Sequence, residues 1–358
     1  MPDAPHSAVI RISLPALQAN YAELRKRSAG DCAGVVKADG YGLGIEPVGS
    51  ALAEAGCREF FVATAMEGVR LRRVLPAVSI RVLEGVFPTT IELLREARLE
   101  PVIASPRDLE LWRAAGAPGT VTVHLDTGME RLGLSVAEQS AIDWGGVDVS
   151  LVMTHYVEAD RLDSAVTRAQ RASFEERRRP FSGVRTSMAN SAGCLLGRDH
   201  HGDLTRPGIG LYGGHPRNLT ADNPMRPVVG LFGRVLRLRD LPAGTTLGYW
   251  GTHRVERASR IAVVGVGYAD GLPRLLSNRG AVAFAGARLP IVGRVSMDVV
   301  QVDATDLSPE AALAADDWVE LFGAHLGLDE VAGWADTIGL EILCGLGGRP
   351  RRDFCASL

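Results

Sequence analysis

Short apolar runs alternate with amphipathic helical patterns from residue 13 to about residue 215. Ser13 precedes a stretch in which apolar residues recur at helical spacing, so it is a candidate N-cap for a first helix. Strand-like runs then occupy residues 32–37, 59–65, 79–85, 101–105, 120–126, 149–156, 183–189 and 206–213. Eight strand–helix units in roughly 200 residues predict a (β/α)8 barrel. A doubly wound open sheet is the alternative, because hydrophobic periodicity does not reveal strand order.

The pattern changes after about residue 225. Alternating or apolar runs now follow one another through turn signals such as "LPAG" (241–244) and "FAGAR" (284–288), which is typical of antiparallel strands. We therefore predict an α/β fold in which residues 8–225 form the (β/α)8 barrel and residues 226–358 form a second, mostly antiparallel β domain. The expected junction is residues 217–228, which include Asn218, Asn223, Pro224 and Pro227.

The overall composition narrows the class of protein. The chain has 358 residues, of which 46% are hydrophobic and 23% charged, and its formal net charge is −3. These values are typical of a globular protein and give no electrostatic basis for binding nucleic acid or a membrane surface. No apolar run reaches the roughly 18 residues that span a bilayer, and we see no secretory signal. The five cysteines are scattered without a CxxC pair, so we expect reduced thiols, no metal site and a cytoplasmic enzyme.

The segment "GVVKADGYGLG" (34–44) places a lysine at the end of an apolar strand. Of the 39 Lys and Arg residues, only Lys26 and Lys37 are lysine. Arginine stays protonated, whereas lysine can lose its proton and act as a nucleophile or a base. Two interpretations of Lys37 remain open at this point. It is either a chemically active amine or a strand-end lysine whose ammonium group reaches water.

Polar and glycine-rich segments follow several of the predicted strands at their C-terminal ends, where the active site of a barrel enzyme forms. These segments are Lys37, residues 126–133, His155, residues 189–193 and residues 206–210. Taken singly, His155 is equally consistent with a buried core histidine and with a site residue. Arg131 is more typical of a surface residue than of a ligand contact.

The last two of these segments also predict a phosphate site. The expected positions are Asn190–Ser191 and Gly208–Ile209, because backbone N–H groups in turns of small residues let an anion approach closely. A strand-end lysine together with a phosphate cradle matches pyridoxal 5′-phosphate, whose aldehyde needs a lysine and whose phosphate needs N–H donors.

Eight motifs resemble the alanine racemase family in order and spacing, from about residue 8 to residue 350. They read "VVKADGYGLG", "HLDTGMERLG", "THYVEAD", "ANSAG", "RPGIGLYG", "LGYWG", "VGYADG" and "IVGRVSMD". The resemblance implies a pyridoxal-phosphate barrel with a C-terminal β domain. It also implies a cytoplasmic homodimer with shared active sites, which interconverts L- and D-alanine and so supplies D-alanine as a peptidoglycan precursor.

Residue roles follow from the resemblance, position by position. It implies that Lys37 is the Schiff-base lysine and the acid or base on one face of the substrate α-carbon. Tyr249 is then the second acid or base, contributed by the other subunit. The cofactor site comprises Lys37, Tyr41, His155, Asn190, Ser191, Arg206, Gly208 and Ile209, with His155 beside the ring and Arg206 facing its nitrogen. The substrate contacts are Arg131, Met297 and Tyr268, with Asp160, Arg274 and Arg294 beside Tyr268 in the entry corridor.

Racemisation explains why two such groups are needed, since a proton leaves one face of the carbon and another arrives on the opposite face. For Tyr249 to act as a base, its pKa must fall from roughly 10. We hypothesise that the Arg206–His155 neighbourhood supplies the positive charge that lowers it. Arg206 should also keep the ring nitrogen unprotonated, which weakens the ring as an electron sink and suppresses transamination.

Some positions depart from the family pattern. His124 stands where many members have a carbamylated lysine, Leu43 replaces a histidine, and Trp250 replaces a common glycine. Near the C-terminus, Gly348 or Phe354 stands where some members have a tyrosine. These changes concern the size of the pocket and the carboxylate contacts, so a larger amino acid is an alternative substrate.

A fold-related pyridoxal-phosphate decarboxylase and a non-catalytic cofactor carrier are two further interpretations. Arg206 counts against the decarboxylase and Tyr249 against the carrier.

Overall fold

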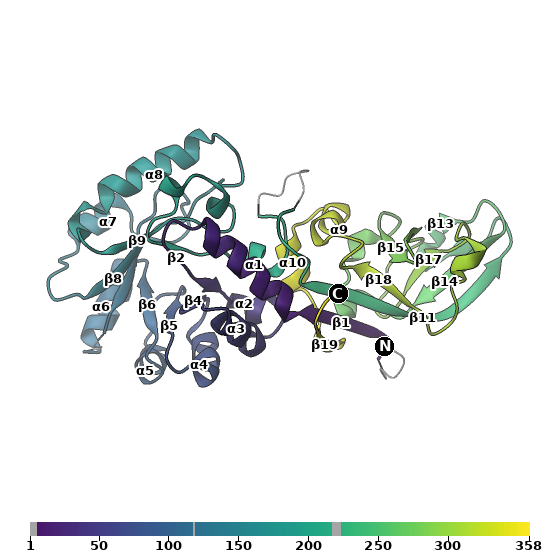
Figure 1. The fold of residues 1–358 in the computed structure, drawn as a ribbon, viewed down its shortest axis with the longest axis horizontal. Coiled ribbons are helices and arrows are strands. Elements are labelled where there is room, and N and C mark those ends of the chain that lie inside the picture. Colours follow the sequence, from purple (N-terminus) through teal and green to yellow (C-terminus); the bar gives the residue numbers. More distant parts are fainter. Residues whose placement is uncertain (1–5, 117–118, 217–222) are drawn as a thin grey trace. The chain divides into compact units, whose positions relative to one another are not determined.

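The structure is a computed structural model, which describes residues 6–116, 119–216 and 223–358 (Figure 1). The chain forms two compact units. One comprises Leu17–Leu211 with the described part of 215–225, and the other comprises residues 6–16, Tyr212–Gly214 and Arg226–Leu358. Asn218 and the rest of 217–222, which belong to the expected junction, lie outside the described residues.

A curled sheet of parallel strands forms the centre of the first unit. Its seven strands, in spatial order, are β3 (Gly34–Val35), β4 (Glu59–Val62), β5 (Ser79–Val82), β6 (Glu100–Ile103), β7 (Val121–His124), β8 (Val149–Met153) and β9 (Arg185–Ser187). Between β9 and β3 lies a parallel pair, β10 (Leu204–Thr205) and β2 (Asp31–Cys32). Backbone hydrogen bonds run from Arg206 N to Ala189 O at 2.8 Å and from Val35 N to Pro207 O at 3.2 Å, so the sheet closes. The predicted barrel is confirmed, and the open sheet is excluded.

The predicted eighth strand is wrong in its position. The strand is Leu204–Thr205, and the predicted run 206–213 instead contains a 3-10 helix, η4 (Ile209–Tyr212). Pro207 has no N–H to donate to a ladder, and glycine weakens a strand, so the segment leaves the sheet soon after Thr205.

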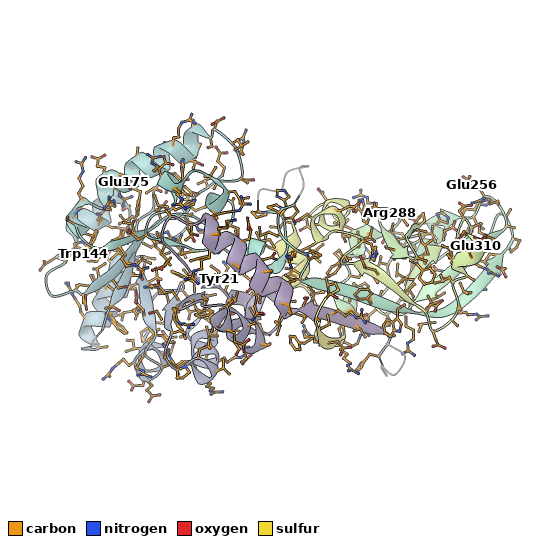
Figure 2. The ribbon with its side chains drawn as sticks, in the orientation of Figure 1. Tyr21, Trp144, Glu175, Glu256, Arg288 and Glu310 are labelled. Atoms are coloured by element: carbon orange, nitrogen blue, oxygen red, sulfur yellow. The ribbon has the colours of Figure 1, made fainter. Side chains whose placement is uncertain are left out.

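Helices flank the outer side of this sheet (Figure 1). They are α1 (Leu14–Arg27), α3 (Ile45–Glu54), α4 (Ala65–Val74), α5 (Ile91–Glu96), α6 (Pro106–Ala114), α7 (Val136–Ala141) and α8 (Ala165–Arg177). The short segment α2 (Lys37–Tyr41) is a turn with a non-helical backbone. As predicted, Ser13 precedes the first helix, and its Oγ accepts from Ala16 N at 3.2 Å. Tyr21 of α1 is buried, and its hydroxyl donates to the carbonyl of Cys32 at 3.0 Å, which fixes α1 against β2 (Figure 2).

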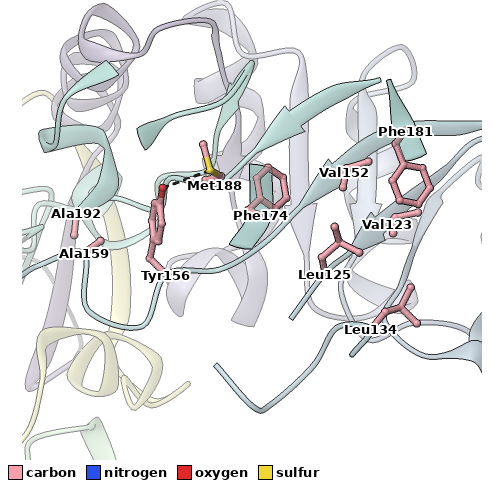
Figure 3. Close-up of a cluster of buried hydrophobic side chains, with 10 residues drawn as sticks. All are labelled: Val123, Leu125, Leu134, Val152, Tyr156, Ala159, Phe174, Phe181, Met188 and Ala192. Carbon is pink, nitrogen blue, oxygen red and sulfur yellow. Dashed lines mark hydrogen bonds between the residues drawn. The ribbon is translucent and has the colours of Figure 1, made fainter. Parts of the chain in front are cut away.

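An apolar cluster joins β7, β8 and β9 to α8 and the following turn (Figure 3). It consists of Val123, Leu125, Leu134, Val152, Tyr156, Ala159, Phe174, Phe181, Met188 and Ala192. Every member is buried, and the hydroxyl of Tyr156 donates to Met188 Sδ at 3.5 Å. Burial of the valine, leucine, phenylalanine and methionine side chains contributes roughly 1.5–3 kcal/mol each. The cluster therefore holds β7, which ends at His124, and β8, which His155 follows.

Charged side chains fill the barrel interior towards the N-terminal ends of its strands. Arg81 is 3% exposed and pairs with Glu59 at 2.6 Å and with Glu100 at 3.1 Å. Arg185 of β9 reaches Glu59 of β4 at 2.9 Å, although these strands are not neighbours in the sheet. The network therefore crosses the interior of the barrel and fills it with paired charges.

The second unit is mostly antiparallel, as predicted. Its large sheet has the order β16–β15–β18–β11–β1–β19, with β14 pairing with β11 and β17. The strands are β1 (Ala8–Ser13), β11 (Val229–Leu241), β14 (Ser259–Val264), β15 (Ala281–Phe284), β16 (Ala287–Pro290), β17 (Val300–Asp303), β18 (Trp318–Phe322) and β19 (Arg351–Cys355). Only the β1–β19 pair in this sheet is parallel among the described strands.

Two further features complete this unit. A small hairpin pairs β12 (Thr246–Leu247) with β13 (His253–Arg254), and two short helices, α9 (Leu328–Trp334) and α10 (Gly339–Cys344), precede β19. Residues 8–13 belong here through β1, although the sequence assigns residues from 8 onward to the barrel. In the described part of the chain, no helix has the length and apolar character needed to cross a membrane.

The interior network makes a prediction about stability. Arg81→Ala should lower the free energy of unfolding by about 3–5 kcal/mol, because it leaves the largely buried Glu100 without its cation and Glu59 with Arg185 alone. Arg95→Ala is the matched control, since Arg95 is 44% exposed and pairs with Glu92 at 3.5 Å. It should change the free energy of unfolding by no more than about 0.5 kcal/mol. Urea denaturation measures both values, and equal losses would contradict the assignment.

Candidate active site

Lys37 begins a turn with an unusual backbone conformation, separated by one residue from the end of β3 at Val35. The φ angles of Ala38, Asp39, Gly40 and Tyr41 are 53°, 54°, 64° and 55°, so four successive residues are left-handed. For residues other than glycine this conformation costs roughly 1–2 kcal/mol each. Such strain persists only where the surroundings enforce it, and it concentrates at functional sites. Lys37 and Tyr41 are therefore presented by a strained turn at the C-terminal rim of the barrel.

A cradle of backbone N–H groups lies beside this turn. Ser191 Oγ accepts from Gly208 N at 2.8 Å and from Gly210 N at 3.2 Å. A Cβ at Gly208 would overlap the hydroxyl of Tyr41, so only glycine lets that hydroxyl come so close to the backbone. The hydrogen bond from Val35 N to Pro207 O places this segment next to the strand that carries Lys37. The arrangement suits a phosphate group, which accepts from N–H and hydroxyl donors.

The other two predicted phosphate-site residues shape the same region. Asn190 Oδ1 accepts from Gly193 N at 2.9 Å, so its side chain fixes the turn after β9. Ile209 is the first residue of η4 and adjoins the cradle glycines.

Arg206 is a buried cation held by neutral groups. It is 5% exposed, its Nη2 donates to Thr154 O at 2.6 Å, and its Nη1 donates to the hydroxyl of Ser187. Among the residues that the structure describes, no carboxylate forms an ion pair with it. Burial lowers the pKa of Arg206 to about 10, so the guanidinium stays protonated at neutral pH. It can face a hydrogen-bond acceptor such as an unprotonated ring nitrogen.

His124 and His155 lie within the field of this cation. Burial, and next the charge of Arg206, lower the pKa of His124 to about 4 and that of His155 to about 3. Arg131 acts on both imidazoles in the same direction, and Lys37 acts on His155, so these side chains share one neighbourhood. Both histidines are neutral at pH 7. Of the Arg206–His155 pair that we expected to supply positive charge, only Arg206 is therefore charged at pH 7, since burial beside Arg206 removes the proton of His155.

His124 lies under the loop that carries Arg131. A Cβ at Gly133 would approach His124 Cδ2 to 3.1 Å, which shows how closely the loop packs on the imidazole. Asp126 Oδ1 accepts from Gly128 N at 2.9 Å, and Arg177 Nη2 donates to Leu134 O at 2.7 Å, so both ends of the loop are tied down. Arg131 itself is exposed. The loop can therefore offer its guanidinium to an anionic ligand.

Tyr249 belongs to the other unit and lies on the turn between β12 and β13. Its side chain is 68% exposed and borders a cavity of about 420 Å³, which is lined by Gly248, Tyr249, Arg294, Ser296, Val299 and Gln301. Trp250 is 85% exposed, and the guanidinium of Arg294 lies 4.1 Å from the centre of its ring. Exposed aromatic residues of this kind are typical of interaction surfaces.

Tyr268 and Met297 lie side by side in the same unit. Tyr268 N donates to Ser296 O at 3.0 Å, and Ala269 N donates to Met297 O at 3.1 Å. Arg349 braces the two loops, because it bonds Asp270 through Nε at 2.7 Å and Asp298 through Nη1 at 2.5 Å. Arg274 and Arg294 also belong to this unit, whereas Asp160 follows β8 in the barrel.

The residues that hold these side chains in place were not identified from the sequence. Ser187 and Thr154, which bind Arg206, are polar positions at or just after the ends of apolar strands. Arg349 lies near the C-terminus, far in sequence from the carboxylates it binds. The available signal was a polar residue within or just after an apolar strand. Such a residue does not reveal which side chain it binds.

Both parts of the chain match known protein families. Residues 12–216 match the alanine racemase N-terminal domain, and residues 228–354 match the alanine racemase C-terminal domain. The alanine racemase of Acidiphilium cryptum is 46% identical over 348 residues, covering 94% of this chain and 96% of the relative. The biosynthetic alanine racemase of Agrobacterium fabrum is 41% identical, with 98% and 95% covered.

Solved structures agree with this similarity. The alanine racemase from Bartonella henselae with covalently bound pyridoxal phosphate has a TM-score of 0.92 at 36% identity, covering 98% of this chain and 100% of that one. The biosynthetic alanine racemase from Pseudomonas aeruginosa has a TM-score of 0.90 at 34% identity, covering 98% and 99%.

The depressed pKa of His124 predicts a pH dependence of stability. Between its folded value of about 4 and its ordinary value of about 6.5, only the unfolded chain binds the proton. Acidification from pH 7 to pH 5 should therefore lower the free energy of unfolding by about 1–2 kcal/mol through this residue. His124→Gln should lose that share of the pH dependence. Urea denaturation at both pH values is the measurement, and equal losses in variant and parent would contradict the prediction.

Proposed function

This chain belongs to the alanine racemase family, and we propose that it interconverts L- and D-alanine with Lys37 and Tyr249 on opposite faces of the substrate. Its cofactor is pyridoxal 5′-phosphate. When bound, that group supplies an aldehyde that joins an amine and a ring that withdraws electrons from the α-carbon. The observation that carries the proposal is the N–H cradle at Gly208 beside the strand of Lys37.

Residues of the barrel fit this cofactor. Lys37 would join the aldehyde, while Tyr41, Ser191 and the backbone at Gly208 and Ile209 would hold the phosphate, in a turn shaped by Asn190. Arg206 would face the ring nitrogen, and neutral His155 would lie beside the ring. Two observations match the chemistry of pyridoxal 5′-phosphate. The guanidinium of Arg206 is buried without a carboxylate partner among the described residues, and a Cβ at Gly208 would fill the N–H cradle.

Arg206 also selects the type of reaction. Because it stays protonated, it can only donate to the ring nitrogen and cannot protonate it as a carboxylic acid would. By leaving the ring nitrogen unprotonated, Arg206 would keep the ring a weak electron acceptor, and so would favour return of a proton to the α-carbon over transamination. This argues against the decarboxylase interpretation, in which the ring nitrogen faces a glutamate.

Proton delivery requires one group on each face of the α-carbon. Lys37 would serve one face. We assign Tyr249 to the other, contributed by the second subunit of a homodimer, and the exposure of Tyr249 and Trp250 supports such an interface. Arg131 and the backbone at Met297 would hold the substrate carboxylate, and Tyr268, Asp160, Arg274 and Arg294 would line the entrance.

We place the boundary between the barrel and the β domain near residues 225 and 226, because the two family matches end at residue 216 and begin at residue 228. Residues 8–13 precede the barrel in the chain but join the β domain through β1. We also place the enzyme in the cytoplasm, since alanine racemisation supplies a precursor made there.

Leu43 is fully buried, so its departure from the family pattern concerns the core of the barrel and gives no support to a larger substrate.

Lys37→Ala should abolish the absorbance of lysine-bound cofactor, because Lys37 is the lysine that lies next to the N–H cradle and the other lysine, Lys26, belongs to α1. Lys26→Ala is the matched control, since Lys26 is the chain's other lysine and is exposed. It should keep the spectrum of the parent. An unchanged spectrum in Lys37→Ala would show that another amine binds the cofactor.

Mixing two inactive variants tests the shared site. Tyr249→Phe should lower racemisation about 10²- to 10⁴-fold while the protein retains its cofactor, because only the second proton-transfer group is lost. If the subunits share sites, a mixture of equal amounts of Lys37→Ala and Tyr249→Phe, dissociated and reassociated, should recover about a quarter of the parent activity. Each mixed dimer then contains one complete site. No recovery in dimers shown to be mixed would refute the sharing, and full activity of Tyr249→Phe would remove Tyr249 from the mechanism.

A further inference from the structure

The turn that presents Lys37 is held by hydrogen bonds from outside its own strand. Gly40 N donates to Val36 O at 2.9 Å and Gly42 N to Ala38 O at 2.8 Å, so these groups are satisfied locally. The N–H of Asp39 instead donates to Glu67 Oε1 at 3.1 Å, and Glu67 belongs to α4. A residue 28 positions away therefore fixes the centre of the left-handed turn.

Glu67 uses both carboxylate oxygens. Its Oε2 accepts from Ala63 N at 2.8 Å and from Thr64 N at 3.3 Å, while Thr64 Oγ1 accepts from Glu67 N at 3.2 Å. These bonds anchor Glu67 to the end of β4 and the start of α4. Because Oε1 remains directed at Asp39, the carboxylate ties the strained turn to a neighbouring strand that is itself part of the closed sheet.

A second contact from α4 reinforces the first. Arg70 Nη2 pairs with Asp39 Oδ1 at 2.8 Å, and the same oxygen accepts from Ile45 N at 3.0 Å. Arg70 is 38% exposed and Asp39 48% exposed, so water weakens this pair. Glu67 is half-buried and binds backbone, which makes it the stronger constraint on the turn.

We propose that Glu67 is a positioning residue of this enzyme, which acts by holding the turn of Lys37 and Tyr41 in its left-handed conformation. The inference rests on the proposed function, in which Lys37 joins the cofactor and Tyr41 contacts its phosphate. Without the bond to Asp39, the residues of the turn that are not glycine would relax towards right-handed or extended conformations. Both functional side chains would then be displaced together.

Glu84 offers a matched control on the same rim. Its Oε1 accepts from Ala65 N at 2.8 Å, so it is also a carboxylate that binds a backbone N–H at the start of α4. Within the described chain, its side chain forms no hydrogen bond to residues 38–42. Glu84→Gln therefore removes the same kind of interaction from the same helix without touching the turn.

The test compares Glu67→Gln with Glu84→Gln in the full-length, cofactor-loaded protein. Glutamine keeps one acceptor oxygen and turns an NH2 group towards the other N–H donors, so at least one bond of Glu67 is lost. Glu67→Gln should weaken cofactor binding, measured by titration, about tenfold, and lower kcat by a similar factor. The KM for alanine should stay within about twofold, because the carboxylate contacts are untouched. Glu84→Gln should have the same thermal midpoint of unfolding as Glu67→Gln, but it should keep the cofactor affinity of the parent. Equal cofactor affinities in the two variants would overturn the proposal.

A rescue experiment separates positioning from general support. Ala38 is left-handed and not fully buried, and glycine adopts that conformation without a steric cost. Ala38→Gly introduced into Glu67→Gln should therefore restore most of the lost cofactor affinity. A double variant as weak as Glu67→Gln would contradict the proposal, because relief of the strained turn would then have no effect.

Borohydride reduction distinguishes failure of this inference from failure of the proposed function. The reagent fixes the cofactor to its lysine, and peptide mass spectrometry has only Lys26 and Lys37 to separate. A parent protein that is not labelled at Lys37 would refute the proposed function. A parent labelled at Lys37, with unchanged cofactor affinity in Glu67→Gln, would refute the role of Glu67 alone.

Discussion

The backbone hydrogen bond from Val35 to Pro207 closes the barrel, and the whole candidate site depends on that closure. It brings the end of the first barrel strand, with Lys37, next to the segment that follows the last strand, with Gly208. These residues are about 170 positions apart in the sequence, yet they share one rim because all the strands are parallel. An open sheet would place its first and last strands at opposite edges.

Positive charge dominates the chemistry of the rim. Arg206 is buried without a carboxylate partner among the described residues, and its field, together with burial, keeps His124 and His155 neutral. The ring of Phe61 is near both this cation and the interior network, since the guanidinium groups of Arg206 and Arg81 lie 5.8 Å and 5.5 Å from its centre. Such a site favours ligands that carry phosphate and carboxylate groups.

Much of the fold could be predicted from the sequence, because strands and helices leave periodic patterns. The rarity of lysine singles out Lys37 as a candidate site residue, and the roles of the site residues stay predictions. The eighth strand was predicted at residues 206–213 but lies at Leu204–Thr205. The apolar residues after Arg206 resemble a strand, although the proline and glycines among them belong to the turn that follows it. The neutral state of His155 depends on burial, which a single sequence does not display. The bond between Asp39 and Glu67 joins separate elements, so no local motif signals it. The pairing of Tyr249 with Lys37 stays a prediction.

The charged network inside the barrel bears on how such an enzyme can change over evolutionary time. Arg81, Glu59, Glu100 and Arg185 link strands on different sides of the barrel, at the N-terminal ends of the strands and away from the N–H cradle at Gly208. These ion pairs hold the strands to one another independently of the loops at the opposite rim. Substitutions in those loops can therefore change specificity while the ion pairs that join the strands remain.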